Sequence, residues 1–231
     1  MSHALDLNAT WPPAATASAG GFLIRQGLGG GRRVSSALLQ SLDWSVQEAE
    51  AAMTGWGQSP CFQIWPEHAA LDTELAGKGY AVGDPAILVE APVRSLALDR
   101  CDERTIFCAG PLMALEEIWR DAGSRPAELR IMDRVQLPKI WIMGRAGDRP
   151  EGAAFVAVSG STAMLHALEV RASARRHGLG ARITRAAASW AAAQGADTLA
   201  LAVRASNEPA IALYSGLGFV EIGRYHYRER A

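Results

Sequence analysis

A glycine-containing loop in the C-terminal half of the chain has the residue types of an anion-binding site. It reads Arg175-Arg176-His177-Gly178-Leu179-Gly180-Ala181 and directly precedes a predicted helix. Glycines at 178 and 180 lack the Cβ atoms that would keep a ligand away from the backbone N–H groups. Because these N–H groups stand at a helix N-terminus, the helix dipole adds partial positive charge to them. The loop therefore predicts a site for a phosphate-rich ligand.

Two known phosphate-binding loops do not match this segment. A P-loop needs Gly-Lys-Ser/Thr, which does not follow here. A dinucleotide fingerprint needs G-x-G-x-x-G and an acidic residue at the end of a second parallel strand, and both are missing. On the loop alone, a glycine-containing turn before an alanine-rich helix stays open as the alternative.

A second group of residues ends a predicted strand and starts a short helix. It reads Leu201-Ala202-Val203-Arg204-Ala205-Ser206-Asn207-Glu208-Pro209-Ala210-Ile211-Ala212-Leu213-Tyr214. Ser206 or Asn207 suits the N-cap of this helix, and Pro209 suits its first turn. Tyr214 then lies on the second turn of the helix, with a hydroxyl that can donate a proton.

Hydrophobic runs and glycine-containing turns predict the elements that position both groups. The strands expected in this half are 139–145, 153–158, 164–170, 198–203 and 220–227, the first three as an antiparallel meander. The helices expected are 111–122, 126–135, 179–194 and 209–217. The predicted fold class is α+β, with a mostly antiparallel sheet flanked by helices.

The first 93 residues repeat part of this order. After residues 1–20, where only Trp11 looks like an anchor, the expected strands or extended runs are 22–25, 33–38, 61–65 and 86–89. The expected helices are 46–56 and 71–76. In both halves a strand leads to a short helix that ends at glycine and then to another strand. Two related units, 1–93 and 94–231, are the hypothesis, and chance similarity stays open.

Taken together, the two groups of residues resemble the GNAT superfamily of acyl-CoA N-acyltransferases. The first has the pattern R-x-x-G-x-G, and the second has the pattern V-R-A-S-N-x-x-A-I-x-L-Y-x-x-L-G-F. The resemblance covers about residues 105–228 and is closest to the bacterial ribosomal-protein alanine N-acetyltransferases. It implies a GNAT-like acetyltransferase domain over 94–231 and a degenerate, smaller GNAT-like unit over 1–93. The run Gly27–Gly31 lacks R-x-x-G-x-G and no helix start is evident after it, so we interpret it as a hairpin turn.

The resemblance implies acetyl-CoA as cosubstrate and a role for each matching residue. The CoA pyrophosphate would be held by Arg175, Arg176, His177, Gly178, Leu179, Gly180 and Ala181. The pantetheine arm would pair with the strand backbone near Leu168 and Val170, and Asn207 would contact the same arm. Tyr214 would protonate the departing CoA thiolate as a general acid. A plain helix cap for Asn207 and a packing role for Tyr214 are the alternatives.

The sequence departs from the family pattern at residue 202. The ribosomal-protein enzymes carry Glu immediately before V-R-A-S-N, and here that residue is Ala202. His166 stands where many family members have an acidic residue, and an imidazole with a pKa near ~6.5 could relay a proton as the catalytic base. Glu169 is expected on the opposite face of an ideal strand from His166. A structural role for His166, and deprotonation through water, stay open.

Composition excludes several classes of function. The chain has 231 residues, a formal net charge of −1 and 49% hydrophobic residues, as in ordinary globular proteins. No global charge attracts nucleic acid or an anionic membrane, and neither a signal peptide nor an apolar run of about 18 residues is present. Cys61, Cys101 and Cys108 have no disulfide or metal-site spacing. We expect free thiols, no metal, and a soluble cytoplasmic protein.

The acceptor of the acetyl group is open between two classes. Ala202 favours a small-molecule primary amine over a protein N-terminal α-amine. The amine pocket is expected around Glu116, Glu117, Trp119 and Asp133. A non-catalytic acyl-CoA-binding regulatory module is the alternative from another class, and a homodimer stays open as the assembly.

Overall fold

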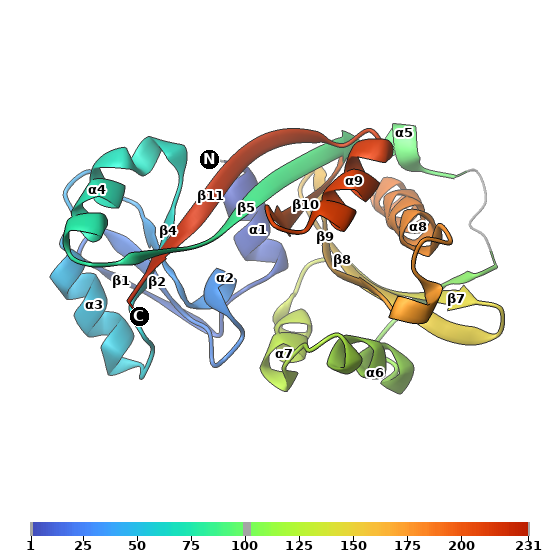
Figure 1. The fold of residues 1–231 in the computed structure, drawn as a ribbon, viewed down its shortest axis with the longest axis horizontal. Coiled ribbons are helices and arrows are strands. Elements are labelled where there is room, and N and C mark those ends of the chain that lie inside the picture. The colour runs from blue at the N-terminus through green and yellow to red at the C-terminus, as the bar shows by residue number, and fades with distance from the viewer. Residues whose placement is uncertain (1, 99–102, 231) are drawn as a thin grey trace.

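One 11-stranded sheet runs through both halves of the molecule, in the order β1-β2-β3-β4-β11-β5-β10-β9-β8-β7-β6 (Figure 1). The computed structural model describes residues 2–98 and 103–230, with the backbone alone at 2–5. The strands are β1 (Ala15–Ala19), β2 (Phe22–Gln26), β3 (Ala37–Leu39), β4 (Cys61–Ile64), β5 (Ala81–Pro92), β6 (Thr105–Cys108), β7 (Lys139–Ala146), β8 (Arg149–Ser159), β9 (Thr162–Val170), β10 (Thr198–Arg204) and β11 (Val220–Glu229). The helices of the described residues are α1 (Ser2–Thr10), α2 (Arg32–Ser35), α3 (Val46–Gly55), α4 (Ala69–Gly77), α5 (Val93–Leu96), α6 (Met113–Asp121), α7 (Pro126–Arg134), α8 (Leu179–Ala193) and α9 (Glu208–Gly216), with one-turn 3-10 helices η1 (Pro66–His68) and η2 (Ala172–Ala174).

The C-terminal half forms the predicted meander β7-β8-β9, and β10 then runs parallel to β9. Because successive residues of a strand face opposite sides, Val156 of β8 packs with α8 while Phe155 packs with α6 and α7. Helix α8 lies close to the sheet because Gly144 and Gly152 leave room for it. A Cβ on either glycine would lie 2.6 Å from Cδ1 of Ile183. This close packing fixes the start of α8 beside the end of β9.

The N-terminal half has the same order of elements as the C-terminal half. Strands β1, β2 and β3 form an antiparallel meander, and β3 runs parallel to β4 as β9 does to β10. Helix α3 connects β3 to β4, and α4 connects β4 to β5. These helices occupy the places in the order that α8 and α9 occupy in the other half.

The last strand of each half lies inside the other half. Strand β11 lies between β4 and β5, and β5 lies between β10 and β11, with every pairing antiparallel. Figure 1 shows these two long strands running together from one half to the other. The two halves therefore share one sheet, and a domain boundary near residue 93 stays a prediction.

The structure differs from the sequence prediction mainly in the first 40 residues. Helix α1 and strand β1 form where the sequence predicts no element, and Leu7 and Trp11 are buried there (1% and 8% exposed). Residues Arg32–Ser35 form helix α2 rather than an extended run, since Val34 is fully buried after the turn at Gly31. Tertiary packing outweighs weak local propensity in both segments. The α+β fold class is confirmed.

Candidate active site

Strands β9 and β10 separate from each other toward their C-terminal ends. Their parallel ladder covers only Thr162–Met164 and Thr198–Ala200. Farther on, β10 stays paired with β5 and β9 with β8. The edge of β9 that faces β10 therefore carries backbone N–H and C=O groups that no described strand uses. The predicted pantetheine contacts, Leu168 and Val170, lie on this part of β9.

A β-bulge in β9 changes which side chains share a face. The partner of His166 on β8 is Phe155, whereas the partner of Glu169 is Ala153, so one extra residue is inserted on β9 between them. Ala167 takes a left-handed conformation there, with φ of 49°. Because Phe155 and Ala153 lie on one face of β8, His166 and Glu169 lie on one face of β9. The expectation that they point to opposite faces is wrong, since it assumes an ideal strand.

The glycine-containing loop forms the N-terminus of α8. Gly178 is the N-cap residue with φ of 80°, and no described side chain caps this end. The first intrahelical bond runs from Arg182 N to Gly178 O, at 3.1 Å. The preceding amides of Leu179, Gly180 and Ala181 thus lack a helical partner, and the helix dipole favours an anion beside them. The local geometry matches the anion site expected from the sequence.

The side chains of the loop tie it to the end of β9. Nε of Arg175 donates to the carbonyl oxygen of Val170 at 2.9 Å. Nδ1 of His177 lies 2.7 Å from the carbonyl oxygen of Arg175, so this nitrogen is the donor. Arg176 has a positive φ of 65° within the turn. These contacts hold the loop next to the predicted pantetheine strand.

Helix α9 brings Asn207 and Tyr214 toward the same region. The carbonyl oxygen of the Asn207 side chain accepts from Ala210 N at 3.2 Å, so the predicted cap is formed while the amide nitrogen is not needed for it. Tyr214 is 6% exposed and packs on Phe219, with ring centroids 5.4 Å apart. Burial, and then the charge of Glu169, raise the pKa of Tyr214. The hydroxyl therefore keeps its proton at neutral pH.

Glu169 lies among charged and polar groups from three elements. Burial raises the pKa of its carboxyl, and the nearby Arg175 and Arg204 oppose this effect without cancelling it. Its influence on Tyr214 places the carboxyl and the hydroxyl close together. A carboxyl with a raised pKa beside a hydroxyl that retains its proton is a suitable pair for acid–base chemistry. The bulge at Ala167 brings Glu169 to this position, and the sequence carries no clear signal of it.

His166 is buried at 2% exposure and holds a defined hydrogen bond. Its Nε2 lies 3.0 Å from Oγ1 of Thr10, and that hydroxyl donates its proton to the carbonyl oxygen of Asp6 at 2.6 Å. Nε2 must therefore be the donor to Thr10. Burial, and then the charge of Arg33, hold the pKa of His166 well below its usual range. The ring is thus neutral, and its Nδ1 is a buried lone pair without a partner among the described residues.

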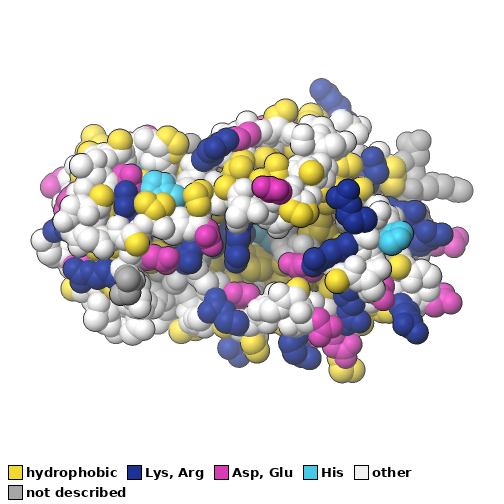
Figure 2. Space-filling view, viewed as in Figure 1, with side chains coloured by type: hydrophobic (Ala, Val, Ile, Leu, Met, Phe, Trp, Pro, Cys, Tyr) yellow, Lys and Arg dark blue, Asp and Glu magenta, His cyan; other side chains and the backbone are white. Residues whose placement is uncertain are grey.

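The N-terminal segment packs against this histidine. The ring of Trp11 lies 4.9 Å from the ring of His166, with Phe155 on β8 at 6.2 Å from the same ring. Figure 2 shows a hollow between the two halves, below β5 and β11 and above α7, with apolar side chains on its floor and Lys or Arg side chains on its rim. Strand β9 and helix α9 border this hollow (Figure 1).

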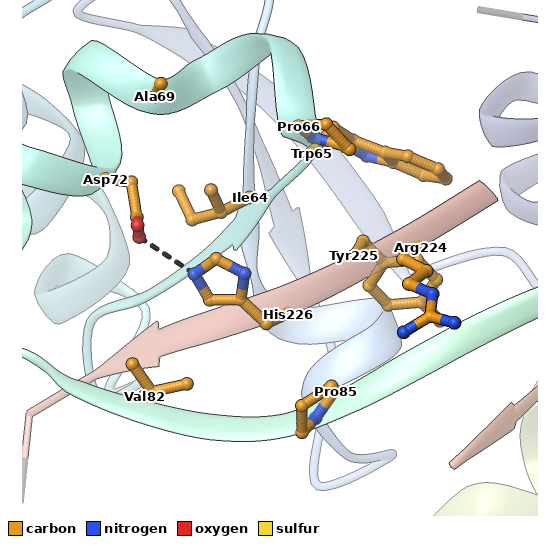
Figure 3. A pocket seen from close by; sticks show the side chains of 10 residues that line it. All are labelled: Ile64, Trp65, Pro66, Ala69, Asp72, Val82, Pro85, Arg224, Tyr225 and His226. Carbon is orange, nitrogen blue, oxygen red and sulfur yellow. Dashed lines mark hydrogen bonds and ion pairs between the residues drawn. The ribbon is translucent and has the colours of Figure 1, made fainter. Parts of the chain in front are cut away.

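Two further cavities lie away from the acid–base pair. Glu116, Trp119 and Asp133, but not Glu117, line a cavity of about 200 Å³ between α6 and α7. A cavity of about 320 Å³ lies among β4, α4, β5 and β11 and contains none of the predicted site residues. Figure 3 shows His226 pointing to Asp72 in this second cavity, with Nε2 and Oδ1 2.8 Å apart.

Other classes of site find little support in the described residues. Burial raises the pKa of the Cys61 thiol to about 12, and burial also raises that of Cys108, so neither is a thiolate at neutral pH. Cys101 lies outside the described residues. Within residues 2–98 and 103–230, no group of three or more His, Cys, Asp or Glu could hold a metal ion. No helix in these same ranges is long and apolar enough to cross a membrane.

Comparison with known proteins relates this arrangement to one family. Residues 112–219 match the acetyltransferase (GNAT) family. The chain is 26% identical to the uncharacterized N-acetyltransferase YobR of Bacillus subtilis (strain 168), over 95% of this chain and 94% of the relative. A GCN5-related N-acetyltransferase from Kribbella flavida has a TM-score of 0.73 and 15% identity, covering 100% of this chain and 95% of that one. A tandem GNAT protein from the clavulanic acid biosynthesis pathway has a TM-score of 0.63 and 14% identity, covering 97% and 86%.

Proposed function

Because residues 112–219 form a domain of the acetyltransferase (GNAT) family, we propose that the protein transfers an acetyl group from acetyl-CoA to a primary amine. The observation that carries this proposal is the pairing of Glu169 with Tyr214 beside the diverging edge of β9. A general base and a general acid are what this reaction needs from a protein. The acceptor we favour is a small molecule, because Ala202 replaces the Glu of the ribosomal-protein enzymes.

The residues present fit acetyl-CoA as cosubstrate. The uncapped amides at Leu179, Gly180 and Ala181 would hold its pyrophosphate, with Arg175 and Arg176 adding positive charge. The unpaired edge of β9 near Leu168 and Val170 would hydrogen-bond the amides of the pantetheine arm, and Asn207 would contact the same arm. The cosubstrate supplies a thioester, whose carbonyl carbon is open to attack by an amine.

Glu169 and Tyr214 then have opposite proton-transfer roles. Glu169 accepts the proton that the amine loses as the carbon–nitrogen bond forms. Tyr214 donates its proton to the sulfur as the carbon–sulfur bond breaks, so the products are an amide and a neutral thiol. We assign the base to Glu169 in preference to His166, because His166 is neutral, buried and bound to Thr10.

Release of CoA thiol across a panel of primary amines tests the proposal. Wild-type protein is expected to release thiol with at least one amine. Glu169→Gln is expected to lose most of this activity, since removing a general base costs about 10²-fold or more. Glu67→Gln, which changes an exposed carboxylate outside the site, serves as the matched control.

The alternative from another class is a non-catalytic module that binds acyl-CoA. Its support is the missing carboxylate at Ala202. Binding of acetyl-CoA without thiol release on any amine would favour this module over the enzyme. Turnover on peptides with free N-termini, but not on small amines, would move the acceptor to a protein α-amine.

A further inference from the structure

Arg25 in β2 is a buried cation whose donors are already used. It is 1% exposed, and burial lowers the pKa of its guanidinium to about 10. Neutral oxygens accept its N–H groups: the Ser36 carbonyl at 2.8 Å, Ser36 Oγ at 2.5 Å, Gln63 Oε1 at 2.8 Å and Asn8 Oδ1 at 2.5 Å. Arg25 therefore has a structural role, and it adds a positive charge that no acid neutralises.

Arg33 in α2 lies near this cation but has different surroundings. It is only half-buried, and the hydroxyls of Tyr225 and Tyr227 lie within hydrogen-bonding reach of its guanidinium. The two tyrosines are 3% and 6% exposed, and their ring centroids lie 5.6 Å apart. Its neighbour Arg32, by contrast, is paired with Asp84 and Glu229.

The two arginines lack a negatively charged partner. In the part of the chain that the structure describes, no carboxylate lies within salt-bridge distance of Arg25 or Arg33. Charged side chains are rarely buried without a counter-charge, because their desolvation is then uncompensated. An anion from outside the protein would supply that counter-charge at Arg33, the more exposed of the two.

Arg33 belongs to the face of the sheet opposite the CoA loop. Tyr225 and Tyr227 pack in one apolar cluster with Met164 and Ala200, whereas the residues on either side of Ala200 pack with α8. The charge of Arg33 also reaches His166, which lies on the same face of β9 as Glu169. The CoA pyrophosphate and the Arg33 cluster are thus on opposite sides of the sheet. The acceptor, and not CoA, is the molecule that Arg33 can meet.

We propose that the acceptor amine carries a carboxylate, and that Arg33, with the hydroxyls of Tyr225 and Tyr227, binds this carboxylate. The inference rests on the proposed acyl transfer, because it names the acceptor class of the same site. The planar guanidinium presents parallel N–H donors that match the two oxygens of a carboxylate, and each hydroxyl adds a donor. The unpartnered Nδ1 of His166 supplies an acceptor for an N–H of the same molecule.

Matched acceptors that differ only in charge test this inference. We would compare ω-amino acids, from glycine to ε-aminocaproate, with their methyl esters, and measure kcat/KM from thiol release. Wild type is expected to prefer the free carboxylate at least ~10-fold at one chain length, as typical for a charged hydrogen bond. Arg33→Gln is expected to bring this ratio close to one, and Arg33→Lys to keep only part of it. Arg32→Gln, on the same helix, is the control and should keep the wild-type ratio.

A binding measurement separates this inference from the proposed function. Addition of γ-aminobutyrate should raise the Tm of the wild type but not that of Arg33→Gln. Tyr225→Phe, which keeps the ring and removes one hydroxyl, should lower both the preference and the Tm rise if Arg33→Gln does not fold. Wild-type turnover with no preference for the carboxylate, or an unchanged preference in Arg33→Gln, would overturn the inference and leave acyl transfer standing. Failure of every amine to react, with a Tm rise that depends on Arg33, would overturn the enzyme but keep the carboxylate site.

Discussion

The carboxyl of Glu169 and the hydroxyl of Tyr214 are both buried near the diverging edge of β9, and burial changes what each does with a proton. A raised pKa makes Glu169 a stronger base than an exposed glutamate. A raised pKa keeps Tyr214 protonated and able to donate. The proximity of the two groups is therefore chemically useful at neutral pH, where one must accept a proton and the other must give one.

Removal of the Tyr214 hydroxyl tests its role as general acid. Tyr214→Phe keeps the ring that packs on Phe219 and is expected to lower kcat about 10²-fold or more, while acetyl-CoA affinity changes little. Steady-state thiol release and calorimetric titration with acetyl-CoA measure the two effects. An unchanged kcat would rule out the assigned role.

The buried Glu169 carboxyl also predicts a pH-dependent cost in stability. Its folded pKa lies above the unfolded value, so the folded state binds its proton more tightly. The stability contributed by this proton is present at low pH and is lost as pH rises through the folded pKa. Glu169→Gln should therefore have a higher Tm than wild type near pH ~7 and a similar Tm near pH ~4. Equal Tm differences at both pH values would contradict the shift.

Sequence and structure agree on Tyr214 and differ on the base. The helix that carries Tyr214 follows from local signals, namely an Asn cap and a proline in its first turn. The position of Glu169 depends on the bulge at Ala167, where a non-glycine residue takes a left-handed conformation. Arg33, Tyr225 and Tyr227 meet only through tertiary packing between distant segments, so no local pattern predicts their meeting.

At the scale of elements, the N-terminus of α8 is the anion site of the account. Its position depends on the glycines of β7 and β8, which let Ile183 pack against the sheet. The loop motif and the helix after it follow directly from the sequence. The separation of β9 from β10 does not, because strand register is set by pairing with β8 and β5 across the sheet.

Two glycines at opposite ends of α8 separate strain from ligand binding. Gly178 and Gly195 both have a left-handed conformation, with φ of 80° and 82°, and a Cβ on either would meet open space. Alanine at each position should lower the free energy of unfolding by about 1–2 kcal/mol. Only Gly178→Ala should also weaken acetyl-CoA binding, because its position is next to the pyrophosphate amides. Urea unfolding and calorimetry give the two quantities, and equal loss of affinity in both variants would argue against the loop as the CoA site.

At the scale of the whole molecule, β5 and β11 join the two halves into one sheet. The repeated order of elements agrees with the similarity seen in the sequence, whereas the exchange of the last strands has no sequence signal. Sequence separation hides it, because β11 lies more than one hundred residues from both β4 and β5 along the chain.

The shared strands predict a single cooperative unfolding transition. Loss of either half would leave a strand of the other without its partner on one edge, so neither half is expected to stay folded alone. Urea curves from far-UV circular dichroism and tryptophan fluorescence should coincide, as in two-state unfolding. Two separate transitions would indicate that the halves fold independently.

The central claim is that acetyl transfer to an amine occurs beside Glu169 and Tyr214. The most direct measurement incubates wild type and Glu169→Gln with acetyl-CoA labelled with deuterium in the acetyl group and a pool of primary amines, and analyses the products by mass spectrometry. The account predicts a labelled amide from at least one amine with wild type, and little or none with Glu169→Gln. Recovery of intact labelled acetyl-CoA from wild type, bound but not consumed by any amine, would contradict it.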